Sequence, residues 1–318
     1  MTTLITLVGE QPIPNLLPIR HIKPERVLFV HTGSGARGTK PVACHIARLV
    51  PEYNPDFVEV DPYDLLNARA QIAAKLSPDE SITVNITGGT KMMALAAYAL
   101  AVERNASFIY LQTEGKTSQR NESLLFYYHF EQSSPQLSKQ EILPTLISAR
   151  DYLLAHLPDY REKGFSQDKN GLSEGGRFEK AIYAALQHMA NERNIDLELL
   201  PGIHPTEVSD TLDIDLVVRS GNQVGVVEIK KGPNKGKHAI DQLTTIARRE
   251  YLGTYTARFV VLGGSVLPDH KLLFENSKIS VAEIKDYHDG QPLSADSCTC
   301  LWNTLATQIP LVSLPESP

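Results

Sequence analysis

The first 130 residues alternate short apolar runs with segments of helical periodicity. Runs rich in Val, Ile, Leu and Phe predict strands at residues 3–8, 26–31, 56–60, 81–87 and 107–112. Helical spacing predicts helices at residues 15–22, 40–49, 64–76 and 91–104. Strands that alternate with helices are typical of βαβ units, so we expect a mostly parallel sheet with helices on both faces. In such sheets, ligands bind at the carboxyl ends of the strands.

The pattern changes after residue 130. Residues 132–135 are polar, residues 139–156 have helical spacing, and residues 159–171 are charged and contain glycine. We interpret residues 131–172 as a connector that holds one helix. The first domain would then be residues 1–130.

A different order of elements starts near residue 173. The pattern predicts a helix at residues 173–194, strands near 197 and at 211–219 and 223–230, a helix at 238–251 and a strand at 258–262. Ser220, Gly221 and Asn222 separate two of these strands, which is a hairpin signal. Residues 173–318 are therefore expected to form a second, mixed α/β domain.

Length and composition agree with an ordinary globular protein. The chain has 318 residues, of which 42% are hydrophobic and 21% charged, and this length is typical of about two domains. No apolar stretch is long enough to span a membrane, and the first ten residues do not resemble a signal peptide. Cys44, Cys298 and Cys300 have no CxxC spacing, which argues against disulfides or structural zinc. We therefore expect a cytoplasmic protein that does not bind membranes.

The net charge of −6 argues against a protein that coats nucleic acid by charge alone. Residues 1–130 carry 12 basic and 12 acidic residues, so the acidic excess lies entirely in the second part of the chain. An enzyme that contacts nucleic acid at one site remains compatible with this charge.

Four polar residues lie on the predicted hairpin of the second domain. Asp213 and Asp215 share one face of a strand, and Glu228 and Lys230 share one face of its partner. The flanking residues are apolar, so these strands are expected to be buried, and buried carboxylates must be neutralised, paired or bound to a metal. Carboxylates suit Mg²⁺ or Mn²⁺, with the backbone carbonyl of Ile229 as a third ligand and Lys230 beside the metal.

This segment resembles the PD-(D/E)xK nuclease superfamily, whose fold is that of restriction endonucleases. The resemblance covers residues 173–262 and rests on Gly175 to Glu179 (GGRFE) at a helix start, Asp213 to Asp215 (DID) and Glu228 to Lys230 (EIK). It implies that Glu179, Asp215, Glu228 and Lys230 are catalytic, with Glu179 supporting the metal directly or through water. The proline of the motif is absent before Asp215. Asp213 competes with Asp215 as metal ligand, and we favour Asp215 because apolar residues follow it directly.

A basic stretch follows the motif and is a candidate for phosphate contacts. It contains Lys231, Lys235, Lys237, Arg248 and Arg249. An ordinary solvated loop and helix would have the same composition. Gln242, on the predicted helix, could reach the site or simply face solvent.

Two glycine clusters follow predicted strands of the first domain. Gly33 to Gly38 (GSGARG) fits the dinucleotide-binding pattern GxGxxG, but it follows the second strand instead of the first. Asn85 to Ala94 (NITGGTKMMA) is more specific, because Gly88 and Gly89 permit close backbone approach and Thr90 can cap the next helix. Lys91 in the first turn of that helix suits a bound anion.

The second cluster, together with Gly9 to Asn15 (GEQPIPN), resembles the CARF (CRISPR-associated Rossmann fold) domain of CRISPR ancillary nucleases. The resemblance implies a homodimer that binds a cyclic oligoadenylate, typically cyclic tetra-adenylate, on its two-fold axis and thereby switches on the nuclease. The residues implied in ligand binding are Gln11, Thr32, Gly33, Ser34, Thr87, Gly88, Gly89, Thr90 and Lys91.

These features predict an activated, metal-dependent nuclease that cleaves DNA, RNA or both in type III CRISPR antiviral defence. One alternative is a CARF-type sensor whose nuclease-like domain only binds nucleic acid or a partner. The presence of all four polar positions of the motif argues against that alternative. A dinucleotide-dependent oxidoreductase, based on Gly33 to Gly38 alone, ranks lower because it does not account for Asp215, Glu228 and Lys230.

Overall fold

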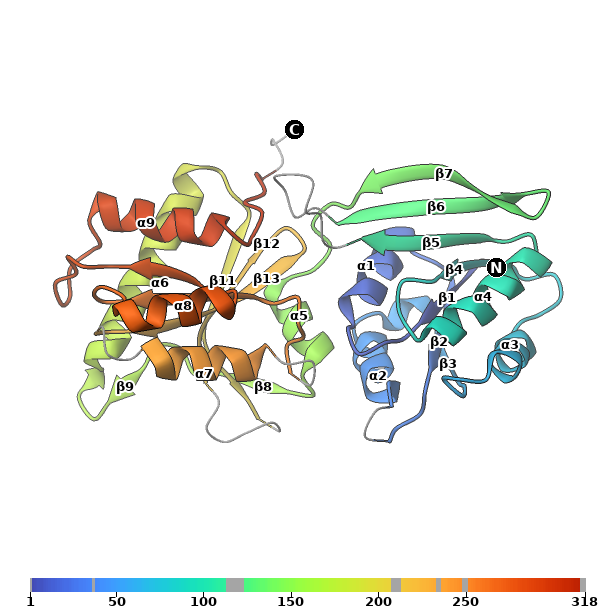
Figure 1. Cartoon of the computed structure of the whole chain (residues 1–318), viewed down its shortest axis with the longest axis horizontal. Coiled ribbons are helices and arrows are strands. Elements are labelled where there is room, and N and C mark those ends of the chain that lie inside the picture. The colour runs from blue at the N-terminus through green and yellow to red at the C-terminus, as the bar shows by residue number, and fades with distance from the viewer. Residues whose placement is uncertain are drawn as a thin grey trace. The chain divides into compact units, whose positions relative to one another are not determined.

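The computed structural model describes residues 2–35, 38–112, 123–206, 213–232, 236–247 and 251–314. The chain divides into two compact units (Figure 1). The N-terminal unit comprises Met1–Leu146 and Leu154–His156, and the C-terminal unit comprises Ile147–Leu153 and Leu157–Pro318. Residues 131–146, expected in the connector, thus belong to the N-terminal unit.

The N-terminal unit is built on a seven-stranded sheet with the order β3-β2-β1-β4-β5-β6-β7. The first five strands pair in parallel and confirm the predicted ones: β1 (Thr2–Leu7), β2 (Arg26–His31), β3 (Pro55–Glu59), β4 (Ser81–Asn85) and β5 (Ser107–Gln112). β6 (Leu124–Glu131) and β7 (Ser134–Ile142) extend it antiparallel. The mostly parallel Rossmann-like sheet is therefore confirmed.

Four α-helices connect the parallel strands, as the periodicity predicted: α1 (Ile13–Ile22), α2 (Lys40–Arg48), α3 (Leu65–Ala74) and α4 (Lys91–Glu103). A short 3-10 turn, η1 (Pro51–Tyr53), precedes β3. α3 and α4 bury Ile72, Met93 and Leu100 against Ile5 and Val30 of the sheet. Burial of these apolar side chains stabilises the unit and fixes the helix that begins at Lys91.

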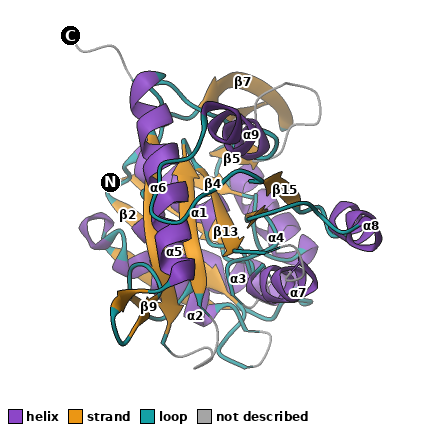
Figure 2. Cartoon of the chain, turned by 90° about the vertical axis from the view of Figure 1, so that its left-hand side faces the viewer, coloured by secondary structure: helices purple, strands orange, loops and turns teal. Residues whose placement is uncertain are grey.

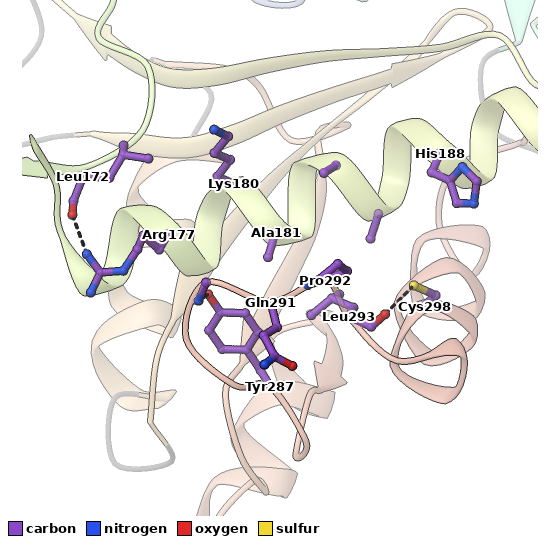
Figure 3. Close-up of a pocket in the computed structure, with 13 residues that line it drawn as sticks. Leu172, Arg177, Lys180, Ala181, His188, Tyr287, Gln291, Pro292, Leu293 and Cys298 are labelled. Carbon is purple, nitrogen blue, oxygen red and sulfur yellow. Dashed lines mark hydrogen bonds between the residues drawn. The ribbon is translucent and has the colours of Figure 1, made fainter.

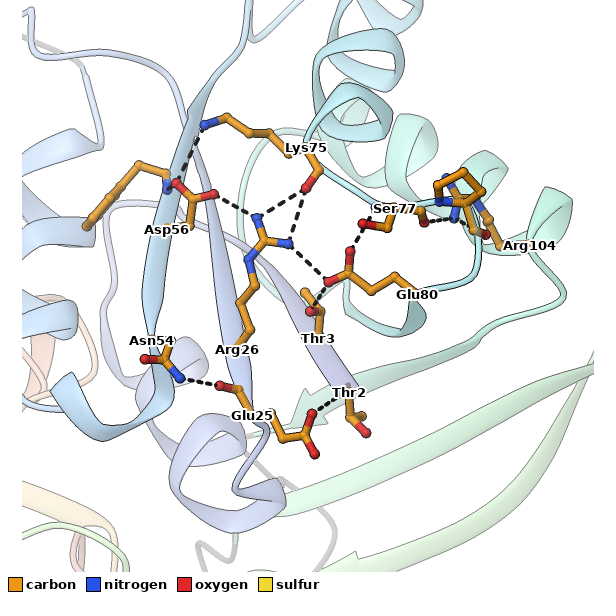
Figure 4. A network of polar contacts seen from close by, with 12 residues as sticks. Thr2, Thr3, Glu25, Arg26, Asn54, Asp56, Lys75, Ser77, Glu80 and Arg104 are labelled. Carbon is orange, nitrogen blue, oxygen red and sulfur yellow. Dashed lines mark hydrogen bonds and ion pairs between the residues drawn. The ribbon is translucent and has the colours of Figure 1, made fainter.

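The amino ends of the first three strands are joined by a polar network (Figure 4). Arg26 donates to Asp56 Oδ2 at 2.7 Å and to Glu80 Oε1 at 3.0 Å. Thr3 of β1 also bonds to Glu80, and Lys75 lies 3.5 Å from Asp56. The network lies at the sheet edge opposite the one where ligands are expected.

The prediction of a helix over residues 139–156 is wrong for the first half of this segment. Residues 134–142 form β7, which pairs with β6 through a two-residue turn, and only α5 (Ala149–His156) is helical. The turn residues Gln132 and Ser133 both have positive φ, which suits the right-handed twist of a hairpin. Because strand pairing depends on a distant partner, local periodicity could not reveal it.

The C-terminal unit has a six-stranded sheet with the order β15-β14-β13-β12-β11-β8. Its strands are β8 (Tyr160–Glu162), β11 (Leu197–Pro205), β12 (Ile214–Ser220), β13 (Gln223–Lys230), β14 (Ala257–Leu262) and β15 (Ser280–Glu283). The predicted antiparallel hairpin of β12 and β13 is confirmed, and β13, β14 and β15 pair in parallel. A separate small ribbon joins β9 (Gln167–Asp168) to β10 (Gly171–Leu172).

Besides most of α5, the described helices of the C-terminal unit are α6 (Glu174–Glu192), α7 (Gly236–Ile246), α8 (Pro268–Asn276) and α9 (Ala295–Ala306). α6 lies along the strands of the sheet (Figure 2) and packs Phe178 and Ile182 on Leu216 and Val227. α9 adds Trp302 to the same core and carries Cys298 and Cys300, which are both free. No helix among the described residues is long and apolar enough to cross a membrane.

Candidate nuclease and ligand-binding sites

The β12–β13 hairpin brings two carboxylates and one ammonium together. Leu216 pairs with Val227, which places Asp215 beside Glu228 on the same face of the sheet. Asp215 Oδ2 accepts hydrogen bonds from Ile229 N at 2.7 Å and from Lys230 Nζ at 3.3 Å. Lys230 also forms an ion pair with Glu228. Lys230 therefore bridges the two acids, and the three side chains lie together on one face of the hairpin, which is the placement that strand alternation predicted.

The cluster is buried. The side chains of Glu228, Asp215 and Lys230 are 1%, 13% and 18% exposed. Both carboxylate oxygens of Glu228 are buried; Oε1 pairs with Lys230 Nζ, and Oε2 has no hydrogen-bond partner among the described residues. A buried carboxylate oxygen without a hydrogen-bond donor is costly unless a cation approaches it.

Burial and crowding change the charge balance of these groups. Burial raises the pKa of Glu228 to about 8, and the neighbouring Asp215 carboxylate raises it as well. Burial also raises the pKa of Asp215, against the opposing effect of Lys230. Burial alone would lower the pKa of Lys230, but the two carboxylates outweigh it and the pKa is raised. The ammonium thus keeps its proton, and the two crowded carboxyls also bind protons more readily than ordinary carboxyls do.

Glu179 completes the acidic side of the site. It lies in the second turn of α6, it is 6% exposed, and its charge contributes to the raised pKa of both Asp215 and Glu228. Its own hydrogen-bond donors come from Ser166, whose N lies 2.9 Å from Oε2 and whose Oγ lies 2.6 Å from Oε1. Ser166 falls in the segment we had interpreted as a connector, and no motif or spacing marks it in the sequence.

The oxygen donors of this site suit a hard divalent cation that takes few of its ligands from the protein and the rest from water. Among the described residues, no three His, Cys, Asp or Glu side chains converge closely enough to hold a metal. Asp215 and Glu228 are nevertheless adjacent, and Glu228 offers an unpaired carboxylate oxygen. A metal here would use these two carboxylates, a backbone carbonyl such as that of Ile229, and water.

Asp213 is separated from this cluster by its own partners. Its side chain is 52% exposed, and Oδ1 accepts from Lys163 Nζ at 2.9 Å and contacts His204 Nδ1 at 2.7 Å. Partial burial raises the pKa of Asp213, but these hydrogen bonds outweigh it and hold the pKa below its ordinary value. The structure therefore brings Asp215, and not Asp213, to Glu228 and Lys230.

Only part of the predicted basic stretch can be placed. Lys231 pairs with Glu174 at the start of α6, and its Nζ lies 5.7 Å from the centre of the Tyr287 ring. Lys235, Arg248 and Arg249 lie outside the described residues, as does the side chain of Lys237. Gln242 lies on α7, and its side-chain oxygen is buried without a described hydrogen bond.

A concavity of the C-terminal unit lies on another face of α6 (Figure 3). It has a volume of about 550 Å³ and is lined by Arg177, Lys180, Ala181, His188, Tyr287, Leu293 and other residues. Arg177 is held by a bidentate contact with Asp289. Residues 177, 181, 184 and 188 follow helical spacing on the side of α6 away from Glu179. The pocket is therefore not part of the carboxylate cluster.

The nine residues expected to bind a ligand lie on loops at one edge of the N-terminal sheet. Gln11 follows β1; Thr32, Gly33 and Ser34 follow β2; and Thr87, Gly88, Gly89, Thr90 and Lys91 follow β4 and open α4. β1 lies between β2 and β4 in the sheet. The chain runs from β1 to β2 on one side and returns to β4 on the other side, so the strand order reverses at this point. This is the topological switch point of the sheet, where ligands of such folds bind.

The loops after β1 and β4 touch because glycines carry no side chain. A Cβ on Gly88 would lie 2.1 Å from Leu7 O, and one on Gly9 would lie 3.2 Å from Gly89 N. Gly89 has φ +73, a conformation that favours glycine. Gly88 and Gly89 thus permit the loop after β4 to lie against the end of β1.

The polar side chains at this edge divide into two groups. The Thr87 hydroxyl donates to Asn85 and accepts from Leu111 N, and the Thr90 hydroxyl caps α4 and donates to Pro62 O. These two hydroxyls therefore hold the loop. Gln11 Nε2, by contrast, is buried without a described acceptor, and Lys91 is exposed with no ion pair among the described residues. Gln11, Lys91 and the exposed Ser34 therefore have side chains that no described hydrogen bond holds in the loops.

Backbone hydrogen bonds join the described residues on the two sides of the loop after β2. Gly38 N donates to Gly35 O and Lys40 N donates to Gly33 O, and a Cβ on Gly38 would lie 2.2 Å from Gly33 O. Ala36 and Arg37 lie outside the described residues. The GxGxxG pattern follows β2, whereas a dinucleotide fold uses the first strand.

Comparison with known proteins agrees with this fold. The structure of Can2 from Sulfobacillus thermosulfidooxidans, in complex with cyclic tetra-adenylate, superposes with a TM-score of 0.70 at 17% identity and covers 96% of each chain. Protein VC1899 from Vibrio cholerae gives 0.69 at 11% identity, covering 96% of this chain and 97% of the other.

A type III CRISPR defence DNA nuclease activated by cyclic oligoadenylate gives a TM-score of 0.64 at 15% identity, and the match covers 96% of this chain but 51% of the nuclease. A search of curated proteins gives no match. Residues 3–139 match the family model of the Card1 CARF domain. Most of the N-terminal unit therefore matches a CARF domain model, in agreement with the resemblance noted for the loops after β1 and β4.

Proposed function

We propose that this protein is a metal-dependent nuclease that cyclic oligoadenylate activates in type III CRISPR antiviral defence. The observation that carries the proposal is the buried Asp215–Glu228–Lys230 cluster, with an unpaired carboxylate oxygen, in a chain that begins with a CARF domain. The likeness to Can2 and to the cyclic-oligoadenylate-activated DNA nuclease extends over both units and supports it.

In the nuclease site, Asp215, Glu228 and the Ile229 carbonyl would hold Mg²⁺ or Mn²⁺. Three carboxylates and one ammonium leave a formal surplus of two negative charges when all are ionised, which a divalent cation offsets. The metal supplies Lewis-acid chemistry to a water and a phosphate oxygen. Lys230 keeps its proton and orients the water or stabilises the charge that develops on phosphate.

In the sensor, the phosphates of the cyclic ligand lie at the carboxyl edge of the sheet. Lys91 contributes charge, Gln11 Nε2 donates a hydrogen bond, and backbone N–H groups of the Gly88–Gly89 loop and the start of α4 face the anion. A second copy of the chain would supply the same loops across a two-fold axis, as a symmetric ring requires. We propose cyclic tetra-adenylate as the ligand.

Activation requires that the ligand bind one arrangement of the dimer more tightly than another, because equal affinity shifts nothing. The test is cleavage of labelled single-stranded and duplex DNA and RNA with Mn²⁺, with and without cyclic tetra-adenylate. We expect cleavage that needs both additions and is lost in Glu228→Gln. The matched control is Glu283→Gln, since Glu283 begins an identical Glu-Ile-Lys tripeptide in which it pairs with exposed Lys285. Cleavage that survives Glu228→Gln would refute the site.

Two outcomes favour the alternatives. Binding of cyclic tetra-adenylate by calorimetry, with no metal-dependent cleavage of any of these substrates, would make the C-terminal unit a binding module. Binding of NAD or NADP in place of the cyclic ligand would favour an oxidoreductase.

A further inference from the structure

Ser166 is the hydrogen-bond partner of Glu179, one of the three carboxylates of the nuclease site. Its backbone N donates to Glu179 Oε2 at 2.9 Å, and its Oγ donates to Oε1 at 2.6 Å. Both carboxylate oxygens are thus held by one residue. We propose that Ser166 is a positioning residue, which orients Glu179 toward the water shell of the metal. This inference rests on the proposed nuclease function.

Ser166 is itself held rigidly by the residues that begin α6. Its carbonyl accepts from Ser173 N at 3.0 Å and from Ser173 Oγ at 3.1 Å. A Cβ on Gly176 would lie 1.9 Å from the same carbonyl, so the contact requires glycine at this position. We call residues 163–173 the arm. The glycine at position 176 of the sequence motif is required because it lets the arm contact the first turn of α6.

The rest of the arm is anchored independently of Glu179. The Phe165 ring packs edge-on against Tyr183 of α6, with ring centres 5.5 Å apart. Lys163 N donates to Gly202 O of β11 at 2.7 Å. Ser166 is presented to Glu179 by contacts on both sides of it, so its hydroxyl is preorganised and the carboxylate loses little further freedom.

This arrangement decides how Glu179 can act. Each carboxylate oxygen has two acceptor positions, and Ser166 uses one on each. The remaining position on each oxygen is open and can accept a hydrogen bond from a water bound to the metal. No three acidic side chains of the described residues converge on one metal position, which agrees with an outer role for Glu179. Partners of this kind change metal affinity by about 10–100-fold when they are lost.

The test measures Mn²⁺ binding by calorimetry on the full-length protein without substrate, together with the shift in Tm that Mn²⁺ causes. In Ser166→Ala we expect an affinity at least about tenfold weaker and a smaller Tm shift. Ser166 is an exposed residue, so this change leaves no cavity in the core. Ser166→Thr keeps the hydroxyl and is expected to retain the wild-type affinity. Gly176→Ala displaces the arm and should weaken affinity at least as much as Ser166→Ala.

The matched control is Ser294→Ala. Ser294 caps α9 in the same unit through Ser297 N, so its loss affects stability without touching the carboxylates. We expect unchanged Mn²⁺ affinity. Equal affinity in wild type and Ser166→Ala would overturn the positioning role while leaving the metal site intact. Failure of the wild-type protein to bind Mn²⁺ would instead refute the metal site of the proposed function.

Discussion

Glu228 and Glu283 begin the same tripeptide, Glu-Ile-Lys, but lie in opposite environments. The Glu228 side chain is 1% exposed and that of Glu283 is 28% exposed. Lys230 is enclosed between Glu228 and Asp215, whereas Lys285 is 61% exposed and pairs with Glu283 alone. The chemistry of the tripeptide therefore depends on the strand that lies beside it.

This difference predicts that Lys230→Met and Lys285→Met behave differently. Lys230→Met leaves buried carboxylates without their cation, so we expect a loss of about 3 kcal/mol in the free energy of unfolding and a loss of about 100-fold or more in cleavage rate. Lys285→Met should change the free energy of unfolding by less than about 0.5 kcal/mol and leave cleavage unchanged. Urea denaturation and single-turnover cleavage measure both. Equal effects of the two substitutions would contradict the buried site.

Glu228→Gln is expected to stabilise the metal-free protein. Glu228 carries a buried oxygen without a hydrogen-bond donor and is repelled by Asp215 and Glu179. Replacing the carboxylate with a neutral amide should leave the Tm measured in EDTA unchanged or raise it. Residues that are kept for function often lower the stability of a protein, and their replacement can raise it. The same substitution should abolish the rise in Tm that Mn²⁺ gives the wild type. A fall of several degrees in the Tm measured in EDTA would contradict this prediction, because it would show that the Glu228 carboxylate stabilises the protein even without a metal.

Lys91→Met should separate ligand binding from stability. Lys91 is exposed and has no ion pair among the described residues, so we expect a change in unfolding free energy within about 0.5 kcal/mol. Loss of its charge should weaken cyclic tetra-adenylate binding by about tenfold and make the affinity less dependent on salt. Calorimetry at two salt concentrations measures both, and Lys23→Met, on an exposed residue after α1, is the control. Unchanged affinity in Lys91→Met would place the ligand elsewhere.

The network around Arg26 predicts how the stability of the protein falls at acidic pH. Burial raises the pKa of Asp56 and Glu80, but hydrogen bonds from Arg26 and other groups outweigh it and both pKa values are lowered. Carboxylates with lowered pKa stabilise the folded state above their unfolded pKa values, near 4, and lose this contribution as pH falls below them. Urea midpoints should therefore fall between pH 5 and pH 3 in the wild type.

The fall should be shallower in Arg26→Met, because the two carboxylates lose their cation. Arg69→Met removes an exposed pair with Glu103 and should keep the wild-type slope. Parallel acid limbs in wild type and Arg26→Met would contradict the role of this network.

The β6–β7 turn gives a prediction independent of function. Ser133 has φ +66 in a two-residue turn between paired strands. Ser133→Gly removes the strain of a left-handed conformation, so we expect Tm to rise by an amount equivalent to about 0.5–1 kcal/mol. Ser134→Gly, one residue later in β7, should lower Tm instead. A lower Tm in Ser133→Gly would show that the turn adopts another geometry.

Much of this protein follows from local sequence. Alternation of apolar runs with helical periodicity determines the five parallel strands and four helices of the N-terminal unit, because each element buries its own apolar face. The spacing of Asp215, Glu228 and Lys230 determines that they share a face of one hairpin, since strand side chains repeat every two residues. The glycines at 88 and 89 mark where β1 and β4 end together.

Other features were decided by tertiary structure alone. β7 exists because residues 134–142 find β6, a non-local pairing that the helical spacing after residue 139 concealed. The sequence could not distinguish Asp213 from Asp215 as the candidate metal ligand. The tertiary structure does, because Asp213 is bound by Lys163 and His204 and not by the carboxylate cluster. Ser166 carries no motif, and it reaches Glu179 because Gly176 lets a distant segment approach the helix. The same tripeptide became a buried cluster at Glu228 and a surface pair at Glu283, because burial and partners depend on packing between elements and not on the order of residues within one.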